Sequence, residues 1–341
     1  MKKDILSLEL NELCSDLENI GEKKFRGKQI YEWLHTKRIH NFEDMSNLSS
    51  ALRTKLSEIY CINRINVVRT LESSIDNTVK YLYELSDGNH IESVMMEYKH
   101  GNSLCISTQV GCKMGCNFCA STIAGFKRHL TVSEMLLQVY EAEKNSGKHI
   151  DSIVLMGIGE PLDNFDNVIK FLKILSFEIG KNLSLRHVSL STCGLVDKIY
   201  ELAEYKFGLT LSISLHATTD EKRNEIMPVN KRHNIAELLQ ACKDYIEKTG
   251  RRISFEYAVI HGVNDTHEDA TRLIKLLKKL NCHINLIPVN EIKERNYRSD
   301  KNALLSFQSI LIKGGLNATI RRTLGADIDA ACGQLRREYE L

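Results

Sequence analysis

The chain has 341 residues, which is enough for one large hydrophobic core and a smaller appended domain. Hydrophobic residues make up 43% of it and charged residues 26%, as in an ordinary soluble globular protein. It contains neither a long apolar run of about eighteen residues nor a charged-then-apolar leader, so we expect a cytoplasmic protein without a membrane contact. The formal net charge of +2 shows no overall bias toward nucleic acid, so any RNA contact needs a local basic patch.

Residues 1–75 are predicted to form a small helical domain. Apolar residues recur there at helical spacing, as in Ile30, Trp33 and Leu34. Basic clusters at 23–28 and 37–38, and further along the chain at 127–128, 321–322 and 336–337, are candidate RNA contacts, although a short basic cluster is more often a solvated surface. Residues 76–100 are predicted to form a connecting β-hairpin, because strand-like residues flank a turn at Asp87-Gly88-Asn89.

From residue 101 onward, apolar β-rich runs alternate with helical patterns. The strand-like runs are 104–110, 153–156, 188–190, 209–215, 253–260, 284–289 and 318–321. A capping box at 131–134 begins the first helix, and further helical patterns cover 165–178, 233–247, 266–279 and 302–313. Continuous apolar strands separated by helices are typical of a parallel sheet covered by helices. We therefore predict an α/β protein with a full or partial (β/α) barrel over 101–325, followed by a C-terminal loop, 326–341.

Three closely spaced cysteines form the strongest motif. Cys112, Cys116 and Cys119 are spaced C-x3-C-x2-C directly after the first barrel strand. Thiolates bind [4Fe–4S] clusters, which normally take four cysteines, and no fourth cysteine follows at suitable spacing. A cluster here would therefore leave one iron open to a substrate. The alternatives are a structural zinc site, which would lack a fourth ligand at zinc-finger spacing, and three incidental thiols.

This spacing resembles that of the radical-SAM superfamily. In that superfamily the open iron binds the amino and carboxylate groups of S-adenosylmethionine (SAM), and one electron cleaves SAM to a 5′-deoxyadenosyl radical. The resemblance implies SAM contacts at Gly159, Glu160, Ser191, Ser214, Leu215, His216 and Asn290. Each of these residues alone would more often belong to a turn or a strand-end cap. Their order at successive strand ends, where barrel active sites lie, favours the SAM-binding interpretation.

Two further cysteines narrow the resemblance. Cys105 precedes the triplet by seven residues, and Cys332 lies in Asp-Ile-Asp-Ala-Ala-Cys-Gly-Gln-Leu, residues 327–335. Each would by composition alone more often be a buried structural thiol. Both segments, together with residues 25–34, resemble the radical-SAM RNA methyltransferases that methylate adenine carbons, and the similarity extends through nearly the whole chain.

The resemblance also implies a ping-pong mechanism, because an electron-poor adenine carbon cannot attack the methyl group of SAM. Cys332 would take a methyl group from one SAM, and the radical from a second SAM would activate that methyl group for addition to adenine. Cys105 would then attack the Cys332 sulfur, which releases methylated RNA and leaves a Cys105–Cys332 disulfide. Glu92 resembles the proton acceptor of the family, although Cys105 is an alternative acceptor and a solvated hairpin carboxylate is the commoner reading of such a residue.

The family has two subtypes. One methylates C2 of an adenosine in 23S rRNA and of an adenosine in some tRNAs, and the other methylates C8 of the same rRNA adenosine and confers antibiotic resistance. Pro161 and the segments 25–34 and 285–290 are more similar to the C2 type. We therefore expect 23S rRNA and tRNA as partners, together with an electron donor such as flavodoxin or ferredoxin.

Two rival functions remain. A radical-SAM enzyme with a non-RNA substrate would leave Cys332 unexplained. A non-enzymatic iron–sulfur or zinc RNA-binding module would have no use for Glu160, Ser191 and Asn290.

Overall fold

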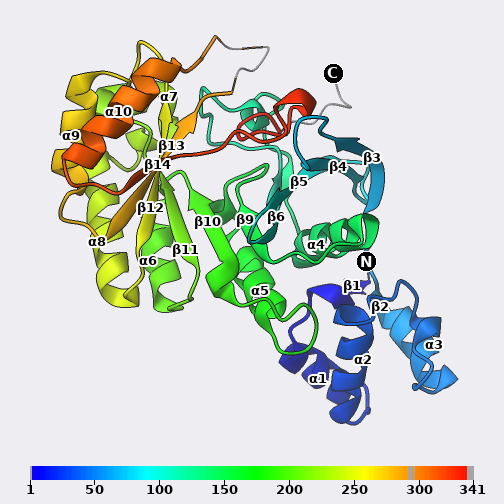
Figure 1. The fold of residues 1–341 in the computed structure, drawn as a ribbon. Coiled ribbons are helices and arrows are strands. Elements are labelled where there is room, and N and C mark those ends of the chain that lie inside the picture. The colour runs from blue at the N-terminus through cyan, green and yellow to red at the C-terminus, as the bar shows by residue number, and fades with distance from the viewer. Residues whose placement is uncertain (1, 291–293, 295, 336–341) are drawn as a thin grey trace.

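The computed structural model describes residues 2–290, 294 and 296–335 and is built around one ten-stranded sheet (Figure 1). Its parallel part follows chain order and consists of β6 (Gly101–Cys105), β9 (Ser152–Leu155), β10 (Val188–Thr192), β11 (Thr210–Ser214), β12 (Ile253–Val259), β13 (Cys282–Pro288) and β14 (Ala318–Ile320). The sheet has β14 at one end and does not close on β6, because β6 pairs with β5 instead. The predicted α/β fold with a partial barrel is therefore confirmed.

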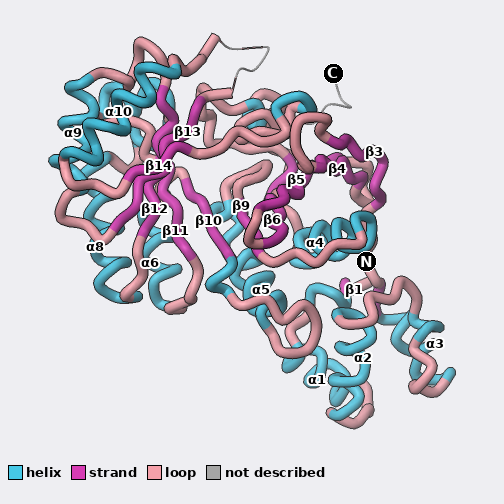
Figure 2. Tube along the Cα trace, viewed as in Figure 1, coloured by secondary structure: helices cyan, strands magenta, loops and turns pink. Residues whose placement is uncertain are grey.

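Helices cover the outer face of this curved sheet, as Figure 2 shows. They are α4 (Val132–Ser146), α5 (Phe165–Ser176), α6 (Val196–Glu204), α7 (Asp220–Ile226), α8 (Ile235–Thr249), α9 (His267–Leu277) and α10 (Lys301–Lys313). The predicted capping box is present at the start of α4, where the Thr131 hydroxyl and the Glu134 carboxylate accept each other's main-chain N–H groups. Leu211 and Ile213 of β11 point to one face of the sheet and Ser212 to the other, and all three are buried, because helices shield one face and the barrel interior shields the other.

The predicted first barrel strand, 104–110, is shorter in the structure. Strand β6 ends at Cys105, and β7 (Gln109–Val110) pairs antiparallel with β8 (Arg128–His129) in a separate small sheet. The continuous apolar run concealed this break because residues on both sides of it are buried. The break lets the chain leave the barrel wall just before the cysteine triplet.

Three antiparallel strands extend the sheet beyond β6, where a single hairpin was expected. They are β3 (Asn66–Glu72), β4 (Val79–Glu84) and β5 (His90–Tyr98). Residues 66–72, which the predicted domain boundary assigned to the helical part, therefore pair with the large sheet. Their sequence carries little apolar signal because β3 is a largely exposed edge strand.

The N-terminal part contains α1 (Leu10–Asn19), α2 (Phe25–His35) and α3 (Ser50–Ile59), with β1 (Lys3–Asp4) paired to β2 (Tyr60–Cys61). Short 3₁₀ segments occupy Ile5–Ser7, Phe42–Asp44, Ala120–Thr122, Pro161–Asn164, Leu185–His187, Pro228–Lys231 and Ala326–Ile328. Within the described part of the chain, none of the helices is both long enough and apolar enough for a bilayer crossing.

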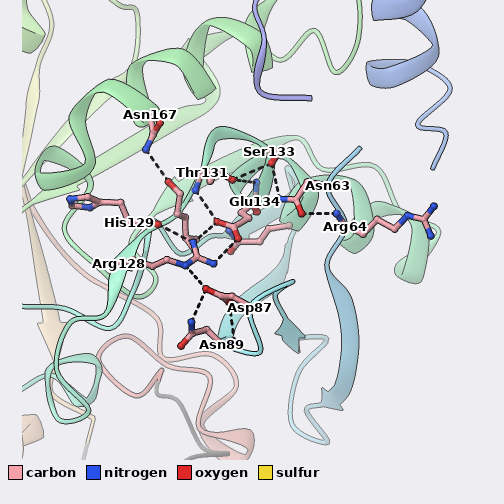
Figure 3. A network of polar contacts seen from close by, with 12 residues as sticks. Asn63, Arg64, Asp87, Asn89, Arg128, His129, Thr131, Ser133, Glu134 and Asn167 are labelled. Carbon is pink, nitrogen blue, oxygen red and sulfur yellow. Dashed lines mark hydrogen bonds and ion pairs between the residues drawn. The ribbon is translucent and has the colours of Figure 1, made fainter. Parts of the chain in front are cut away.

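A polar network ties these parts together at the start of α4 (Figure 3). The guanidinium of Arg128 binds both oxygens of Glu134 at 2.8 Å and reaches Asp87, in the β4–β5 turn, at 2.6 Å. The amide of Asn63 donates to the Ser133 hydroxyl at 3.0 Å and so connects the N-terminal part to α4. These contacts fix the position of the strand that closes the cysteine loop.

Candidate active site

The three cysteines of the triplet lie on the loop between β7 and β8. Gly111 and Gly115 both have φ of +72°, a conformation that favours glycine. A Cβ atom on Gly111 would collide with the carbonyl oxygen of Gly125 on the returning part of the loop. The two glycines therefore let the loop fold tightly enough to bring its thiols together.

One cavity at the C-terminal ends of the barrel strands unites most of the predicted site residues. The predicted residues that line it are Cys112, Cys116, Cys119, Gly159, Glu160, Ser191, Ser214, His216, Asn290 and Cys332. Leu215 is fully buried outside this lining, and Cys105 and Glu92 are also buried outside it. Residues from six separate strand ends and loops thus meet where a barrel enzyme has its active site.

The triplet fits an iron–sulfur cluster in its chemistry. Cys112 is a buried thiol and Cys116 a partly buried one. The pKa of both is raised, mainly by burial and further by the neighbouring Cys119 sulfur, and that of Cys112 reaches about 12. Iron supplies the positive charge that turns such thiols into thiolates. Among the described residues, no three His, Cys, Asp or Glu side chains converge on one point at which a single metal ion could bind, as the ligands of a zinc site do. The cysteines of a [4Fe–4S] cluster bind different irons and need not converge on one point.

A fifth thiol, in addition to the triplet and Cys332, also lines the cavity. Cys193 follows β10 and lines the same cavity, although nothing in its sequence spacing connects it with the triplet. Its main-chain N–H donates to the Glu160 carboxylate at 2.7 Å, and its carbonyl accepts from Arg223 at 2.7 Å. The Glu160 carboxylate also accepts from the N–H of Leu162 at 3.0 Å, so it is fixed at the edge of the cavity.

Arg223 is fully buried and organises the strand ends beneath the cavity. Its guanidinium donates to the carbonyls of Cys193 (2.7 Å), Ser214 (3.0 Å) and Leu215 (3.0 Å), and to the amide oxygen of Asn230 (2.9 Å). Burial, with the Arg223 charge nearby, lowers the pKa of His216 to about 3, so that this histidine is neutral at pH 7. The main chain of Leu215 is held beneath the cavity by its bond to Arg223. Arg223 escaped the sequence analysis because its role depends on main-chain groups that only the fold brings together.

The loop that carries Cys332 closes one side of the cavity. The Asn290 amide donates to the Cys332 carbonyl at 3.1 Å, and the Ala120 N–H, beside Cys119, donates to the Gly333 carbonyl at 2.7 Å. The predicted C-terminal loop is described only as far as Leu335, so its residues 336–341 lie outside the described part.

Cys105 packs against this loop from below, in an apolar cluster with Val94, Ala330 and Leu335. Burial raises the pKa of the Cys105 thiol to about 12, and the neighbouring Cys332 thiol adds to the shift. Each of the ten cysteines, all within the described residues, is a free thiol. The two cysteines are thus neighbours in their reduced forms.

Arg321, which the sequence offered only as part of a basic cluster, lies in the cavity. It follows β14, lines the cavity, and its guanidinium lies 3.9 Å from the Glu256 carboxylate. The nearby Cys332 and Glu256 raise the pKa of Arg321, so its guanidinium is charged beside the loop that contains Cys332. Its position directly after the last barrel strand was the available signal.

Comparisons with known proteins agree with this geometry. The family model of the radical SAM superfamily matches residues 106–286, and that of the ribosomal RNA large subunit methyltransferase N-terminal domain matches residues 3–62. A probable dual-specificity RNA methyltransferase RlmN from Lachnoclostridium phytofermentans is 54% identical over 339 residues, which is 99% of this chain and 95% of the relative. Its counterpart from Clostridium novyi is 53% identical and covers 99% of this chain and 98% of the relative. The chain belongs to the RlmN family of radical-SAM RNA methyltransferases.

A solved structure supports the same family assignment. The crystal structure of a radical SAM methyltransferase from Sphaerobacter thermophilus superposes with a TM-score of 0.92 at 38% identity, covering 98% of this chain and 99% of that one. Membership of the radical SAM superfamily implies a [4Fe–4S] cluster and SAM as cofactors. The cavity at the C-terminal ends of the barrel strands contains the thiols and polar groups that fit these two cofactors.

Glu92, the residue predicted as proton acceptor, lies in an environment that differs from the solvated hairpin considered in the sequence. It is on β5, only 1% exposed, and its carboxylate lies 3.1 Å from the ammonium group of Lys80 on β4. Lys80 also donates to the carbonyl of Asp329 at 3.3 Å, in the loop that carries Cys332. Glu92 is therefore ion-paired in the interior of the protein, next to the loop that carries Cys332.

Proposed function

We propose that this enzyme methylates C2 of an adenosine in 23S rRNA and of an adenosine in tRNA, by transfer through an S-methylated Cys332. The observation that carries the proposal is the position of Cys332, which lines one cavity together with the cysteine triplet and the strand-end residues expected to bind SAM. We further propose that the reaction takes place in the cytoplasm, consumes two SAM molecules per turnover and draws its electron from a flavodoxin or ferredoxin.

The residues of the cavity divide into three roles. Cys112, Cys116 and Cys119 would hold the [4Fe–4S] cluster, which when bound supplies the electron that cleaves SAM to an organic radical. Gly159, Glu160, Ser191, Ser214, Leu215, His216 and Asn290 would bind and orient SAM. The Glu160 carboxylate suits the amino group of SAM, because two main-chain N–H groups hold it in place and leave it acceptor capacity.

Cys332, Cys105 and Glu92 would perform the methyl transfer to RNA. The Cys332 thiolate would attack the methyl carbon of one SAM and release S-adenosylhomocysteine. The radical from a second SAM would remove a hydrogen atom from the S-methyl group, so that this carbon bonds to adenine. After the adduct returns one electron, Glu92 or Cys105 would take the proton from the adenine carbon. Attack of Cys105 on the Cys332 sulfur would then break the bond from that sulfur to carbon, form a Cys105–Cys332 disulfide and release the methylated adenine once its carbon is protonated. The packing of Cys105 against the Cys332 loop supports the last step, because that step joins these two sulfurs.

The RNA would be held mainly by the N-terminal part. On α2, the Phe25 side chain is 53% exposed with the Arg26 guanidinium 4.9 Å from its ring centre, and the Lys37 ammonium group lies 3.3 Å from the centre of the Trp33 ring. Exposed aromatic and basic side chains of this kind stack on unpaired bases and bind phosphates. The target adenosine must leave its stack to reach the cavity.

Mass spectrometry of cellular RNA tests the proposed substrate and the methylated carbon. Cells that lack the gene are compared with cells that express this protein, and nucleosides from 23S rRNA and tRNA are analysed separately. We expect 2-methyladenosine in both RNAs only when the protein is present. The appearance of 8-methyladenosine would replace the C2 assignment by the C8 alternative, and unchanged RNA would overturn an RNA substrate.

Replacement of Cys105 by alanine is expected to trap the enzyme on its RNA. Without this thiol the carbon bridge between Cys332 and adenine cannot be resolved, so a covalent protein–RNA adduct should accumulate while free methylated RNA falls to a few per cent or less. Denaturing gels with labelled RNA measure the adduct. Cys242→Ala, a buried thiol on α8 away from the cavity, is the matched control. Product release by Cys105→Ala at the normal rate would remove Cys105 from the mechanism.

A further inference from the structure

The loop that carries Cys332 is attached to the turn between β3 and β4, far from the cysteine triplet. The carboxylate of Asp327 accepts three hydrogen bonds from this turn: from the Ser73 hydroxyl at 2.7 Å, the Ser74 N–H at 2.8 Å and the Ser74 hydroxyl at 3.0 Å. Asp76, in the same turn, accepts from the N–H of Gly325 at 3.1 Å. In Figure 1 the red C-terminal segment accordingly runs back to the blue and cyan strands of the early chain.

The other end of the loop is attached to the cysteine loop. The Ser121 hydroxyl donates to the Leu335 carbonyl at 2.9 Å, and the Ala120 N–H donates to the Gly333 carbonyl at 2.7 Å. Cys332 therefore lies between two anchored points. Within this span the Asn290 amide also donates to the Cys332 carbonyl at 3.1 Å.

The backbone of the loop is compact around the first anchor. Gly325 and Asp329 have φ of +62° and +50°, so the chain turns sharply on both sides of Asp327. A Cβ on Gly325 would lie 2.8 Å from the side chains of both Thr78 and Ala330, which shows how closely the loop and the β3–β4 turn approach each other. The Lys80 contact to the Asp329 carbonyl adds a further bond from β4 to this end of the loop.

We propose that the β3–β4 turn is a clamp for the Cys332 loop and that Asp327 is its positioning residue. The proposal rests on the proposed carrier role of Cys332. Methyl transfer requires the sulfur to meet SAM and then adenine with an accuracy that a free loop does not provide, since a misplacement of about 1 Å can cost a factor of about 100 in rate. The carboxylate of Asp327 restricts the loop from outside the cavity, so it acts without touching SAM or RNA.

Alkylation of Cys332 in the cofactor-free protein tests the clamp directly. The protein is treated with N-ethylmaleimide, and peptide mass spectrometry follows each cysteine over time. Loss of three hydrogen bonds in Asp327→Ala should speed modification of Cys332 roughly tenfold, because the released loop opens more often and exposes its thiol to the reagent. Asp327→Asn, which keeps an acceptor oxygen for Ser73, should produce a smaller increase. Cys61 on β2 is the internal reference, and its rate should stay unchanged.

Two controls separate the clamp from general loosening. Asp197→Ala removes another exposed carboxylate, one that pairs with Arg232 at 3.1 Å, and should leave the Cys332 rate unchanged. Asp327→Ala placed on a Ser73→Ala, Ser74→Ala background should have a smaller additional effect than on the natural chain, because the partners are already missing. A Cys332 rate within twofold of the natural protein, or an equal rise at Cys61, would overturn the clamp.

The reconstituted enzyme supplies a second readout. Asp327→Ala should lower kcat for RNA methylation about tenfold or more while KM for RNA stays the same, since the clamp positions the sulfur and does not hold RNA. Failure of the proposed function is distinguishable: if the natural protein methylates no RNA but Asp327→Ala still accelerates alkylation, the clamp stands and the carrier role falls. If methylation occurs and alkylation does not respond, the clamp alone is wrong.

Discussion

Cys332→Ala is expected to lose RNA methylation by a factor of about 10³ or more, as enzymes do when a covalent nucleophile is removed, while cleavage of SAM to 5′-deoxyadenosine continues. Alanine has no sulfur to accept a methyl group, so the first half of the transfer cannot occur. SAM cleavage should survive because the proposed cluster ligands and strand-end contacts lie on other segments of the cavity. The contrast between the two reactions is what assigns a carrier role to this thiol.

The two reactions are measured on the same reconstituted sample. Chromatography quantifies 5′-deoxyadenosine, and labelled SAM reports transfer of the methyl group to RNA. Cys282→Ala on β13, a partly buried thiol outside the cavity, should keep both activities and is the matched control. Mass spectrometry of the natural protein should find a methyl group on Cys332. Methylated RNA from Cys332→Ala would end the covalent mechanism.

The sequence predicted those parts of the site that local patterns encode. Alternating apolar strands and helices indicated the barrel, and the capping box at Thr131 placed the start of α4 correctly. Strand ends also predicted a shared position for Glu160, Ser191 and Asn290, because parallel strands present their C-terminal ends at one edge. Apolar periodicity and helix capping act within one helix or strand, and the regular order of parallel strands places their ends together.

Contacts between distant segments were beyond this reasoning. Ser73 and Asp327 are separated by 254 positions, and no spacing rule connects them. Arg223 donates to main-chain carbonyls, which every residue has. The side chains of its partners therefore give no indication of these bonds in the sequence. From the sequence, Glu92 could be a solvated carboxylate. Its ion pair with Lys80 depends on the register in which β4 and β5 pair, and that register is set only in the folded sheet.

The position of Cys193 bears directly on the cluster. The sequence predicted an iron open to SAM because no fourth cysteine lies near the triplet in the chain. A thiol that lines the cavity beside the triplet raises the alternative of four cysteine ligands, which would leave no iron free for SAM. Its main-chain N–H and carbonyl are bonded to Glu160 and Arg223, so its backbone is tied to the strand ends and not to the cysteine loop.

Substitution of Cys112 and of Cys193 is therefore expected to have opposite results. Cys112→Ala should lose the visible absorbance of the anaerobically reconstituted cluster and reduce SAM cleavage to background, because two thiolates cannot hold the cluster against loss of iron. Cys193→Ala should keep about the natural iron and sulfide content and cleave SAM. Mössbauer and EPR spectroscopy measure the cluster, and circular dichroism of both proteins before reconstitution checks their folding. A cluster that is lost in Cys193→Ala, or retained with SAM cleavage in Cys112→Ala, would contradict a three-cysteine site, because the first identifies a fourth ligand and the second removes one of the three.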